Sequence, residues 1–522
     1  MTRWQAGAQP ARIAAVVLAL VAAPALAACG SDSTSTASNG ASLTISSSAP
    51  PRSIDPVLAA DAVIDEVDVA LYDNLIDYTA DGKLEGRLAQ SFQLAPDAKS
   101  IDITLRDASF HDGSKVTAED VKYTLDRIKQ LGVGVATQVA EYDSTTVKDD
   151  HTLTINLSKP TNVFVGALSH VYILNSKLVA KNAGADAGQA WLANNDAGSG
   201  PYELAKYVPT QTIAFKRYDG HWDPATKDAI AQITYRTIAE SSTQRDELLA
   251  GTTQASENID PADLSQFAGN KKFTLTQLPK ASGTYVIFNT QKGITANPKV
   301  REAIRLSYDY QAHLDHLLGG YGNIATGPLP SIMPCRAESA PAMDLAKAKQ
   351  LVDEAGVSGS SLKMVFQPIF GEQQDAATAL QSNLKQIGIN LKLQATTYTD
   401  YLKDLKSVDS TPDMALIFDN PPTADPGSML FTRYDSQFVG SSTNFSQYKN
   451  PAFDALVEKA ITSGDQEQAC DLYKQAQDIL IKDSVVMYMA DHATVVVSTV
   501  KFTGLKQFPA HVGWVPQSLR LG

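Results

Sequence analysis

The chain has 522 residues, more than one hydrophobic core usually serves, so we expect two or three lobes. An apolar content of 43% and a charged content of 19% are ordinary for a soluble globular protein, and no segment after the N-terminal region is apolar enough for a transmembrane helix. The formal net charge of −13, with no basic run beyond pairs such as Lys271-Lys272, argues against nucleic acid as a partner.

Residues 1–28 have the layout of a signal peptide. Arg3 and Arg12 supply positive charge, and the apolar run after them ends in small side chains directly before Cys29. Small residues followed by cysteine resemble the bacterial lipobox, which implies that Cys29 is lipidated and becomes the first residue of the mature chain. The alternative is an ordinary secretory signal in which Cys29 has no role. Residues 29–42 lack apolar periodicity, so we expect a flexible tether that holds the folded body near a membrane.

Two further cysteines, Cys335 and Cys470, remain in a chain that we expect to work in an oxidising compartment. A disulfide between them would close a long loop and constrain the unfolded chain by roughly 4 to 5 kcal/mol. Two separate buried thiols are the alternative, because sequence alone cannot place the two Cα atoms within bonding range. We therefore treat the pair as a candidate disulfide.

Short alternating strands and capped helices are mixed along the chain. Residues 101–105 alternate apolar and polar side chains, which predicts a half-buried strand. Thr117 and Asp120 then resemble a capping box, and apolar residues at helical spacing continue to Leu131. A strand followed by a capped helix is therefore predicted here.

Asparagine, proline and glycine mark further helix ends. Asn297-Pro298 and Asn450-Pro451 each place an N-cap residue before a proline at the first helical position, so a helix should follow each pair. Amphipathic helices are predicted over residues 344–355 and 377–387, because apolar residues recur at helical spacing and a glycine follows each.

Two unbroken apolar runs, 414–418 and 485–489, are typical of central strands that are covered on both faces. Such strands alternating with capped helices predict an α/β fold. No fixed-period repeat appears in the chain, which argues against solenoids and propellers.

The sequence carries no recognisable enzyme motif: a Walker loop, a dinucleotide-binding glycine fingerprint and paired catalytic carboxylates are all absent. Ser199 is followed two residues later by Pro201, which indicates a turn rather than a nucleophile elbow. His313 and His316 could share a helix face and bind a metal, but without a third ligand nearby the expected role is a solvated face. We assign no catalytic residue, metal or cofactor, and an extracytoplasmic hydrolase stays an alternative on composition alone.

Several blocks spread along residues 43–522 are similar to one family. In chain order they are Pro51-Arg52-Ser53-Ile54-Asp55-Pro56, Asp81-Gly82-Lys83-Leu84, Phe110-His111-Asp112-Gly113-Ser114, Gly198-Ser199-Gly200-Pro201-Tyr202, Asn297-Pro298-Lys299-Val300-Arg301 and Asn450-Pro451-Ala452-Phe453-Asp454. With these blocks the chain resembles the large extracytoplasmic solute-binding proteins of ABC importers. Members of that family carry oligopeptides, dipeptides and, in some cases, nickel or oligosaccharides.

This resemblance implies a two-lobed fold of the periplasmic-binding-protein type, with mixed sheets flanked by helices and two hinge crossings. Lobe 1 would take residues 43–284 and 496–522, with an inserted subdomain at about 81–197, and lobe 2 residues 285–495. Such a protein captures its solute by hinge closure and delivers it to a membrane permease and its ATPase. The implied molecule is a monomer that binds peptide and contacts the membrane through Cys29.

The resemblance also implies a binding site. Peptide binders of the family hold the ligand as an added strand and meet its α-ammonium with a carboxylate, because a buried unpaired charge is costly. The run 414–418 leads into Asp419-Asn420, and the stretch to Asp425 is similar to the family's Asp-Asn/Tyr-x-Asp/Glu-Pro pattern. We expect Asp419 to be the anchor, with Asn420 beside it and Asp425 as the second choice. On the facing lobe, Asp61 and Ala62 are expected to contact the ligand backbone.

Alternatives remain open for the ligand and the site. The tryptophan commonly found before the family's Asp is absent, and the segment from Asp419 to Asp425 is longer than the family's, which puts the substrate class in doubt. A turn or helix-cap carboxylate is the alternative role for Asp419. An oligosaccharide or a chelated metal such as nickel is the alternative ligand, although aromatic residues at 7% are not enriched as sugar stacking would require. Tyr285 and Trp514 are expected to be core residues rather than cleft aromatics.

Overall fold

The computed structural model describes residues 40–511, 513 and 515–522 of the chain. The predicted signal peptide and the predicted lipidation of Cys29 concern residues outside the described ranges, and Trp514 lies outside them as well. No helix within the described ranges combines the length and the apolarity needed to cross a membrane.

The tether prediction is wrong at its last residue. Strand β1 (Ser42–Ser47) begins at Ser42, which pairs in parallel with Gln232 of β10 (Gln232–Thr237). The alternation of Leu43 and Ile45 with polar residues explains this start, because both apolar side chains are buried in the core.

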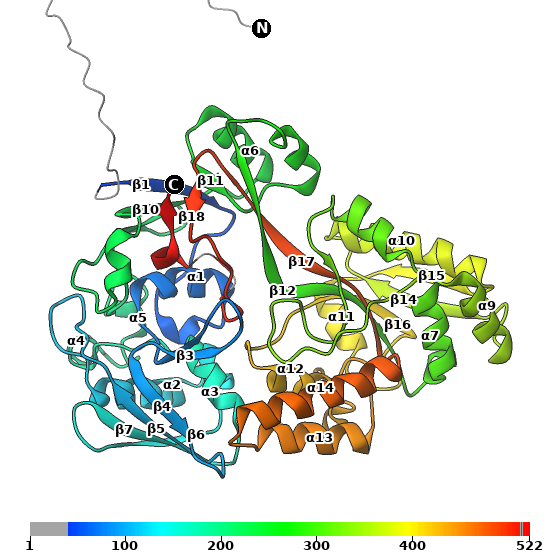
Figure 1. Cartoon of the computed structure of the whole chain (residues 1–522), viewed down its shortest axis with the longest axis horizontal. Helices are drawn as coiled ribbons and strands as arrows, with labels where there is room; N and C mark the ends of the chain where they lie inside the picture. The colour runs from blue at the N-terminus through cyan, green and yellow to red at the C-terminus, as the bar shows by residue number, and fades with distance from the viewer. Residues whose placement is uncertain (1–39, 512, 514) are drawn as a thin grey trace, which may run out of the picture. The chain divides into compact units, whose positions relative to one another are not determined.

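A mixed eleven-stranded sheet runs through the described residues (Figure 1). Strand β14 is parallel to β15 and β16, whereas β12 is antiparallel to β16 and β17, so the sheet is mixed as predicted. From one edge to the other its strands are β15 (Asn390–Ala395), β14 (Ser361–Phe366), β16 (Met414–Asp419), β12 (Thr274–Phe288), β17 (Val486–Ser498), β11 (Ala255–Ser256), β1, β10, β9 (Thr212–Arg217) and β8 (Tyr202–Val208), with β13 (Asn323–Ile324) paired to β17.

The two longest strands, β12 and β17, lie side by side (Figure 1) and pair along most of their length. Their register breaks in the middle of β12. The register passes from Pro279 opposite Ala493 to Gly283 opposite Asp491, so residues 280–282 are left out of the regular pairing. Pro279 has no amide hydrogen to donate, which suits the position before a break. A Cβ at Gly283 would lie 2.5 Å from the carbonyl oxygen of Ala490, so only glycine fits there.

A separate antiparallel sheet has the order β4 (Ala89–Leu94), β5 (Ser100–Leu105), β7 (Thr152–Leu157) and β6 (Tyr142–Val147). The predicted strand 101–105 is β5, and its apolar side chains are buried. The predicted helix is α2 (Ala118–Leu131), which begins with a capping box of Thr117 and Asp120 and ends at Gly132 in the left-handed conformation. Both predictions are confirmed.

Helices cover both faces of strands β14 and β16. In β16, Met414 and Leu416 belong to one core, with α7 (Pro298–Ser307), α9 (Leu345–Glu354) and α10 (Gly371–Gln386). Ala415 and Ile417 belong to the core on the other side, with α12 (Pro426–Tyr434), α13 (Pro451–Ile461) and α14 (Gln466–Lys482). The run 414–418 is therefore a central strand covered on both faces, as predicted.

The predicted starts of the helices are confirmed with one exception. Asn297, Asp344 and Asn450 cap α7, α9 and α13. Helix α10 begins at Gly371, well before the predicted residue 377, because its first turns are polar and the preceding residue carries no capping side chain.

Cys335 and Cys470 are joined in a disulfide, with their Cα atoms 5.0 Å apart and 135 residues between them in sequence. Cys470 lies in α14, which packs against α13. The remaining helices and strands are α1 (Ala62–Leu71), β2 (Ile76–Tyr78), β3 (Leu84–Gly86), α3 (Val163–Ala167), α4 (Ser176–Lys181), α5 (Gln189–Leu192), α6 (Ser241–Ala250), α8 (Tyr310–Ala312), α11 (Tyr398–Asp404), β18 (Phe502–Thr503) and β19 (Arg520–Leu521).

Candidate ligand-binding cavity

A cavity of about 340 Å³ lies where segments from distant parts of the chain meet. Its wall includes the break in β12, and the loop after β16 supplies Asn420 to Ala424. The remaining wall comes from the start of α1, from Gln138 and His170, and from residues 509–511 near the C-terminus. Because Gln138 donates a hydrogen bond to the carbonyl of Pro422 (3.2 Å), opposite walls of the cavity are already linked.

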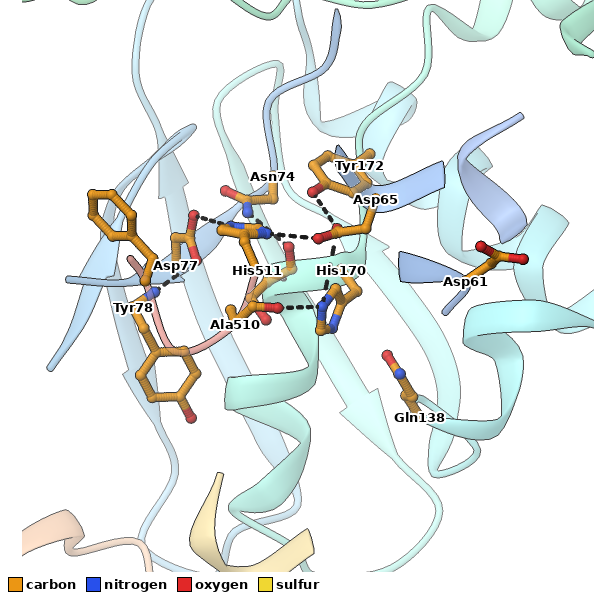
Figure 2. A network of polar contacts seen from close by, with 12 residues as sticks. Asp61, Asp65, Asn74, Asp77, Tyr78, Gln138, His170, Tyr172, Ala510 and His511 are labelled. Atoms are coloured by element: carbon orange, nitrogen blue, oxygen red, sulfur yellow. Dashed lines mark hydrogen bonds and ion pairs between the residues drawn. The ribbon is translucent and has the colours of Figure 1, made fainter. Parts of the chain in front are cut away.

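A buried polar network forms one wall of this cavity (Figure 2). The ring of His511 lies between two carboxylates, with Nδ1 3.0 Å from Asp65 Oδ2 and Nε2 3.0 Å from Asp77 Oδ2. The hydroxyl of Tyr172 donates to Asp65 Oδ1 (2.7 Å), and His170 Nε2 donates to the carbonyl of Ala510 (2.8 Å). These bonds fix the side chains that line the cavity.

The electrostatics of this network favour a proton on His511. Burial alone would lower the pKa of His511, but the carboxylates of Asp77 and Asp65 raise it well above its ordinary value. The pKa of Asp77 is held below its usual range, because the interaction with His511 outweighs burial, which opposes it. A charged imidazole between two carboxylates therefore holds the wall together.

Asp419, the predicted anchor, ends β16 and is 8% exposed. Its carboxylate accepts hydrogen bonds from Arg433 Nε (3.1 Å), from an Arg433 terminal nitrogen (2.9 Å) and from the backbone of Asn420 (3.0 Å). Arg433 lies over the ring of Phe445, with its guanidinium carbon 4.9 Å from the ring centroid. The carboxylate thus has a protein partner, and it borders a void of about 10 Å³ rather than the large cavity.

The other predicted site residues divide between the cavity and helix caps. Asn420 and Ala62 line the cavity together. Asp61 is the N-cap of α1, where it accepts from the amide of Val63 (3.1 Å), and it stands beside the lining residue Ala62. Asp425 caps α12 by accepting from the amide of Gly427 (2.7 Å), and burial raises the pKa of Asp425 to about 6. Asp425 does not line the cavity.

The sequence reasoning missed Asp65, His170 and His511. A signal existed for the first of them, because Asp65 and Asp68 stand three residues apart among the apolar residues of α1, and both are buried. The two histidines carried no such signal, since each lies in a short turn or loop far away in sequence.

A second polar cluster lies around Glu372 in α10. His313 Nε2 lies 3.1 Å from Glu372 Oε1, and His492 Nε2 lies 3.3 Å from Oε2. Burial would raise the pKa of Glu372, but its hydrogen bonds with His313, His492 and Thr284 lower it to about 2. The expectation of a solvated face for His313 and His316 is therefore wrong for His313, which is buried, although His316 is exposed. Tyr285 is buried against Tyr488, which confirms its expected core role.

The sequence profile of the bacterial extracellular solute-binding proteins, family 5 (middle), matches residues 83–441. A probable D,D-dipeptide-binding periplasmic protein, DdpA, of Escherichia coli K12 is 30% identical over 459 residues, which cover 86% of this chain and 88% of that protein. The glutathione-binding protein GsiB of Pectobacterium atrosepticum is 26% identical over 473 residues, which cover 88% of this chain and 90% of that protein.

Solved structures share the fold. The periplasmic binding protein DppA from Helicobacter pylori, in complex with the peptide STSA, has a TM-score of 0.70 at 23% identity and covers 93% of this chain and 98% of its own. HbpA2 from Haemophilus parasuis has a TM-score of 0.81 at 20% identity, with 92% and 100% covered. The two-lobed α/β fold of periplasmic binding proteins is thereby established. The chain belongs to the bacterial extracellular solute-binding proteins of family 5, and it is a substrate-binding protein of an ABC transporter.

Proposed function

We propose that this protein captures short peptides and delivers them to a membrane permease and its ATPase. The observation that carries the proposal is the cavity of about 340 Å³ beside the break in β12, in a chain whose relatives are named for dipeptides and glutathione. This volume lies near the lower end of the roughly 300 to 1,000 Å³ of small-molecule sites, which favours a peptide of two or three residues.

Hinge closure is the proposed mechanism. We propose lobe boundaries at 284/285 and 495/496, with an inserted subdomain at about 81–197. Both boundaries fall within the paired strands β12 and β17, and the break at residues 280–282 lies between them along the ladder. Because β12 and β17 are not regularly paired at this break, a few residues there can change their φ and ψ angles when the lobes close. Enclosure would then exclude water and strengthen the polar contacts to the peptide backbone.

Within this site we propose Asn420 and Ala62 as contacts, since both line the cavity. Asp61 stands beside Ala62 at the N-terminus of α1. If Asp419 anchors the α-ammonium of the peptide, its carboxylate must accept a further donor besides Arg433. If Asp425 is the anchor instead, its carboxylate must give up the hydrogen bond that caps α12.

The proposed setting is outside the cytoplasm, with Cys29 lipidated and the folded protein acting as a monomer without catalytic activity. Changing Cys29 to Ala should move the protein from the membrane fraction to the soluble fraction. Unchanged membrane association of that variant would refute the anchor.

The test of the proposed function is closure on peptide binding. Small-angle scattering and thermal melting of ligand-stripped protein should give a smaller radius and a higher melting temperature with a bound dipeptide or tripeptide, because binding to the native state alone stabilises it by RT ln(1 + [L]/Kd). A panel of peptides that changes neither quantity would contradict the proposal. A response to oligosaccharides alone would support the alternative ligand.

A further inference from the structure

Three ligating side chains from distant segments converge at the wall of the cavity: Asp65 of α1, His170 at the end of a 3-10 turn (Leu168–His170), and His511 (Figure 2). One donor atom from each lies within 4.8 Å of those of the other two. Asp65 Oδ2 is 3.0 Å from His511 Nδ1, and Asp65 Oδ1 is 4.0 Å from His170 Nε2. A single ion between these atoms would need only small side-chain shifts to reach metal–ligand distances of about 2.0 to 2.2 Å.

We propose that Asp65, His170 and His511 bind a divalent transition metal ion of the zinc class, with its open coordination positions facing the cavity. Two imidazole nitrogens and one carboxylate oxygen are a donor set that suits zinc rather than calcium or magnesium, which prefer oxygen ligands alone. All three residues are 2 to 7% exposed, yet all three line the cavity of about 340 Å³. The site is therefore shielded on the protein side and reachable from the cavity side.

The surroundings of His511 match what a metal-binding histidine requires. A ligating histidine usually donates its second N–H to a carboxylate, which fixes the ring, and Asp77 Oδ2 lies 3.0 Å from His511 Nε2. The hydroxyl of Tyr172 fixes Asp65 in the same way, through a hydrogen bond of 2.7 Å to Oδ1. Both ligands are thus oriented before any metal binds.

The local charge also favours a cation. Asp68, one helical turn from Asp65, is fully buried, and neither of its carboxylate oxygens has a hydrogen-bond partner among the described residues. Within the same described part of the chain, no lysine or arginine forms an ion pair with Asp65, Asp68 or Asp77. The protonated ring of His511 now bridges Asp65 and Asp77, and a divalent ion bound in place of the proton on Nδ1 would supply the positive charge at this point.

The competing interpretation is a purely structural network. His511 bridges Asp65 and Asp77, and His170 donates to the carbonyl of Ala510 at 2.8 Å, so hydrogen bonds alone hold the cluster in this structure. Metal binding would replace the proton on His511 Nδ1 and on His170 Nε2, and Ala510 would lose its donor. A structural network predicts that added metal binds weakly and without dependence on these two histidines.

The Glu372 cluster is a weaker candidate. His313 and His492 both contact Glu372, but Asp65, His170 and His511 are the group that brings three donor atoms this close within the described ranges. The Glu372 carboxylate also accepts from Thr284, which leaves it well satisfied.

The experiment uses untagged, chelator-treated protein and zinc chloride alone, without peptide. Calorimetry with elemental analysis should give one zinc ion per chain, and His170→Gln and His511→Gln should each weaken binding by at least 100-fold. Asp77→Asn should weaken it by about 10- to 100-fold, as expected of a residue that orients a ligand. His151→Gln, which removes an exposed histidine, is the matched control and should bind like the wild type.

Cobalt substitution keeps the test valid if a variant fails to fold, because it needs the wild type only. Bound Co²⁺ should give visible absorption bands of a site with nitrogen ligands, and zinc should displace them. The inference is overturned if no stoichiometric zinc binds, or if His170→Gln and His511→Gln bind as the wild type does. The proposed peptide function would survive that outcome, because peptide binding is measured separately in the presence of chelator.

Discussion

The buried pair of Asp419 and Arg433 allows a prediction that separates a structural role from a ligand-binding role. The two side chains are only 10% and 18% exposed, and two hydrogen bonds join them. Removing one partner of a buried ion pair leaves the other charge uncompensated and costs about 3 to 5 kcal/mol. We therefore expect Asp419→Asn to lower the free energy of unfolding by about 3 kcal/mol, the lower end of this range, because both groups keep some solvent contact.

The geometry also limits what Asp419 can offer a ligand. An ionised carboxylate has roughly four acceptor positions. Arg433 and the amide of Asn420 occupy two on Oδ1, and Arg433 occupies one on Oδ2. About one position therefore remains for a peptide ammonium.

Two assays test this reasoning together. Urea unfolding of Asp419→Asn, Arg433→Gln and the double variant gives the coupling within the protein, and the double variant should recover part of the lost stability. Calorimetry with a bound peptide and its N-acetylated form, on wild type and Asp419→Asn, gives the coupling to the ligand. An anchor predicts about 2 to 5 kcal/mol for the second coupling. A purely structural pair predicts none, and a loss of stability below about 0.5 kcal/mol would refute the buried-pair argument itself.

Three further predictions concern stability. Replacing Cys335 and Cys470 by Ser should lower the free energy of unfolding by about 5 kcal/mol, because the disulfide spans 135 residues. Equal urea midpoints for the variant and the wild type would contradict this prediction. The pKa of Glu372 is lowered to about 2, so its ionised carboxylate should stabilise the fold by about 3 kcal/mol above pH 4.5. This contribution should vanish as the pH falls to 2. The free energy of unfolding of Glu372→Gln should therefore be lower than that of the wild type above pH 4.5 and approach it at pH 2. The pKa of Asp425 is raised to about 6, so its ionised carboxylate destabilises the fold increasingly from pH 4 to pH 6 and in full above pH 6. Asp425→Asn keeps a capping side chain, so the variant should gain about 3 kcal/mol at pH 7 and nothing below pH 4. A variant that is less stable at pH 7 would show that the charge is needed for the cap.

Local patterns in the sequence were enough to predict most of the secondary structure and the α/β fold class. The apolar run 414–418 becomes a central strand because both of its faces meet helices, and Asn297 and Asn450 cap helices as their positions before proline indicate. The start of α10 could not be placed, since its first turn has neither a cap nor an apolar face.

The cavity wall could not be predicted, because its contacts join residues far apart in the chain. Asp65 and His511 are separated by 446 residues, and nothing local to either one marks the other as its partner. The partner of Asp419 was missed although it lies only 14 residues further along the chain, because Arg433 reaches the carboxylate only through the packing of α12 beside the end of β16. Of the three cavity residues that were missed, only Asp65 could be noticed in the sequence, because it is a carboxylate among the apolar residues of α1.

The central claim is that the cavity binds a short peptide, and calorimetry on ligand-stripped protein tests it most directly. Dipeptides and tripeptides, in both L and D forms and in the presence of chelator, should include at least one that binds with one-to-one stoichiometry and micromolar or tighter affinity. Replacing Ala62 by Trp, at the exposed start of α1 in the cavity wall, should weaken that binding at least tenfold while the fold is kept. If no peptide of the panel binds, or if Ala62→Trp leaves the affinity unchanged, the cavity is not the peptide site.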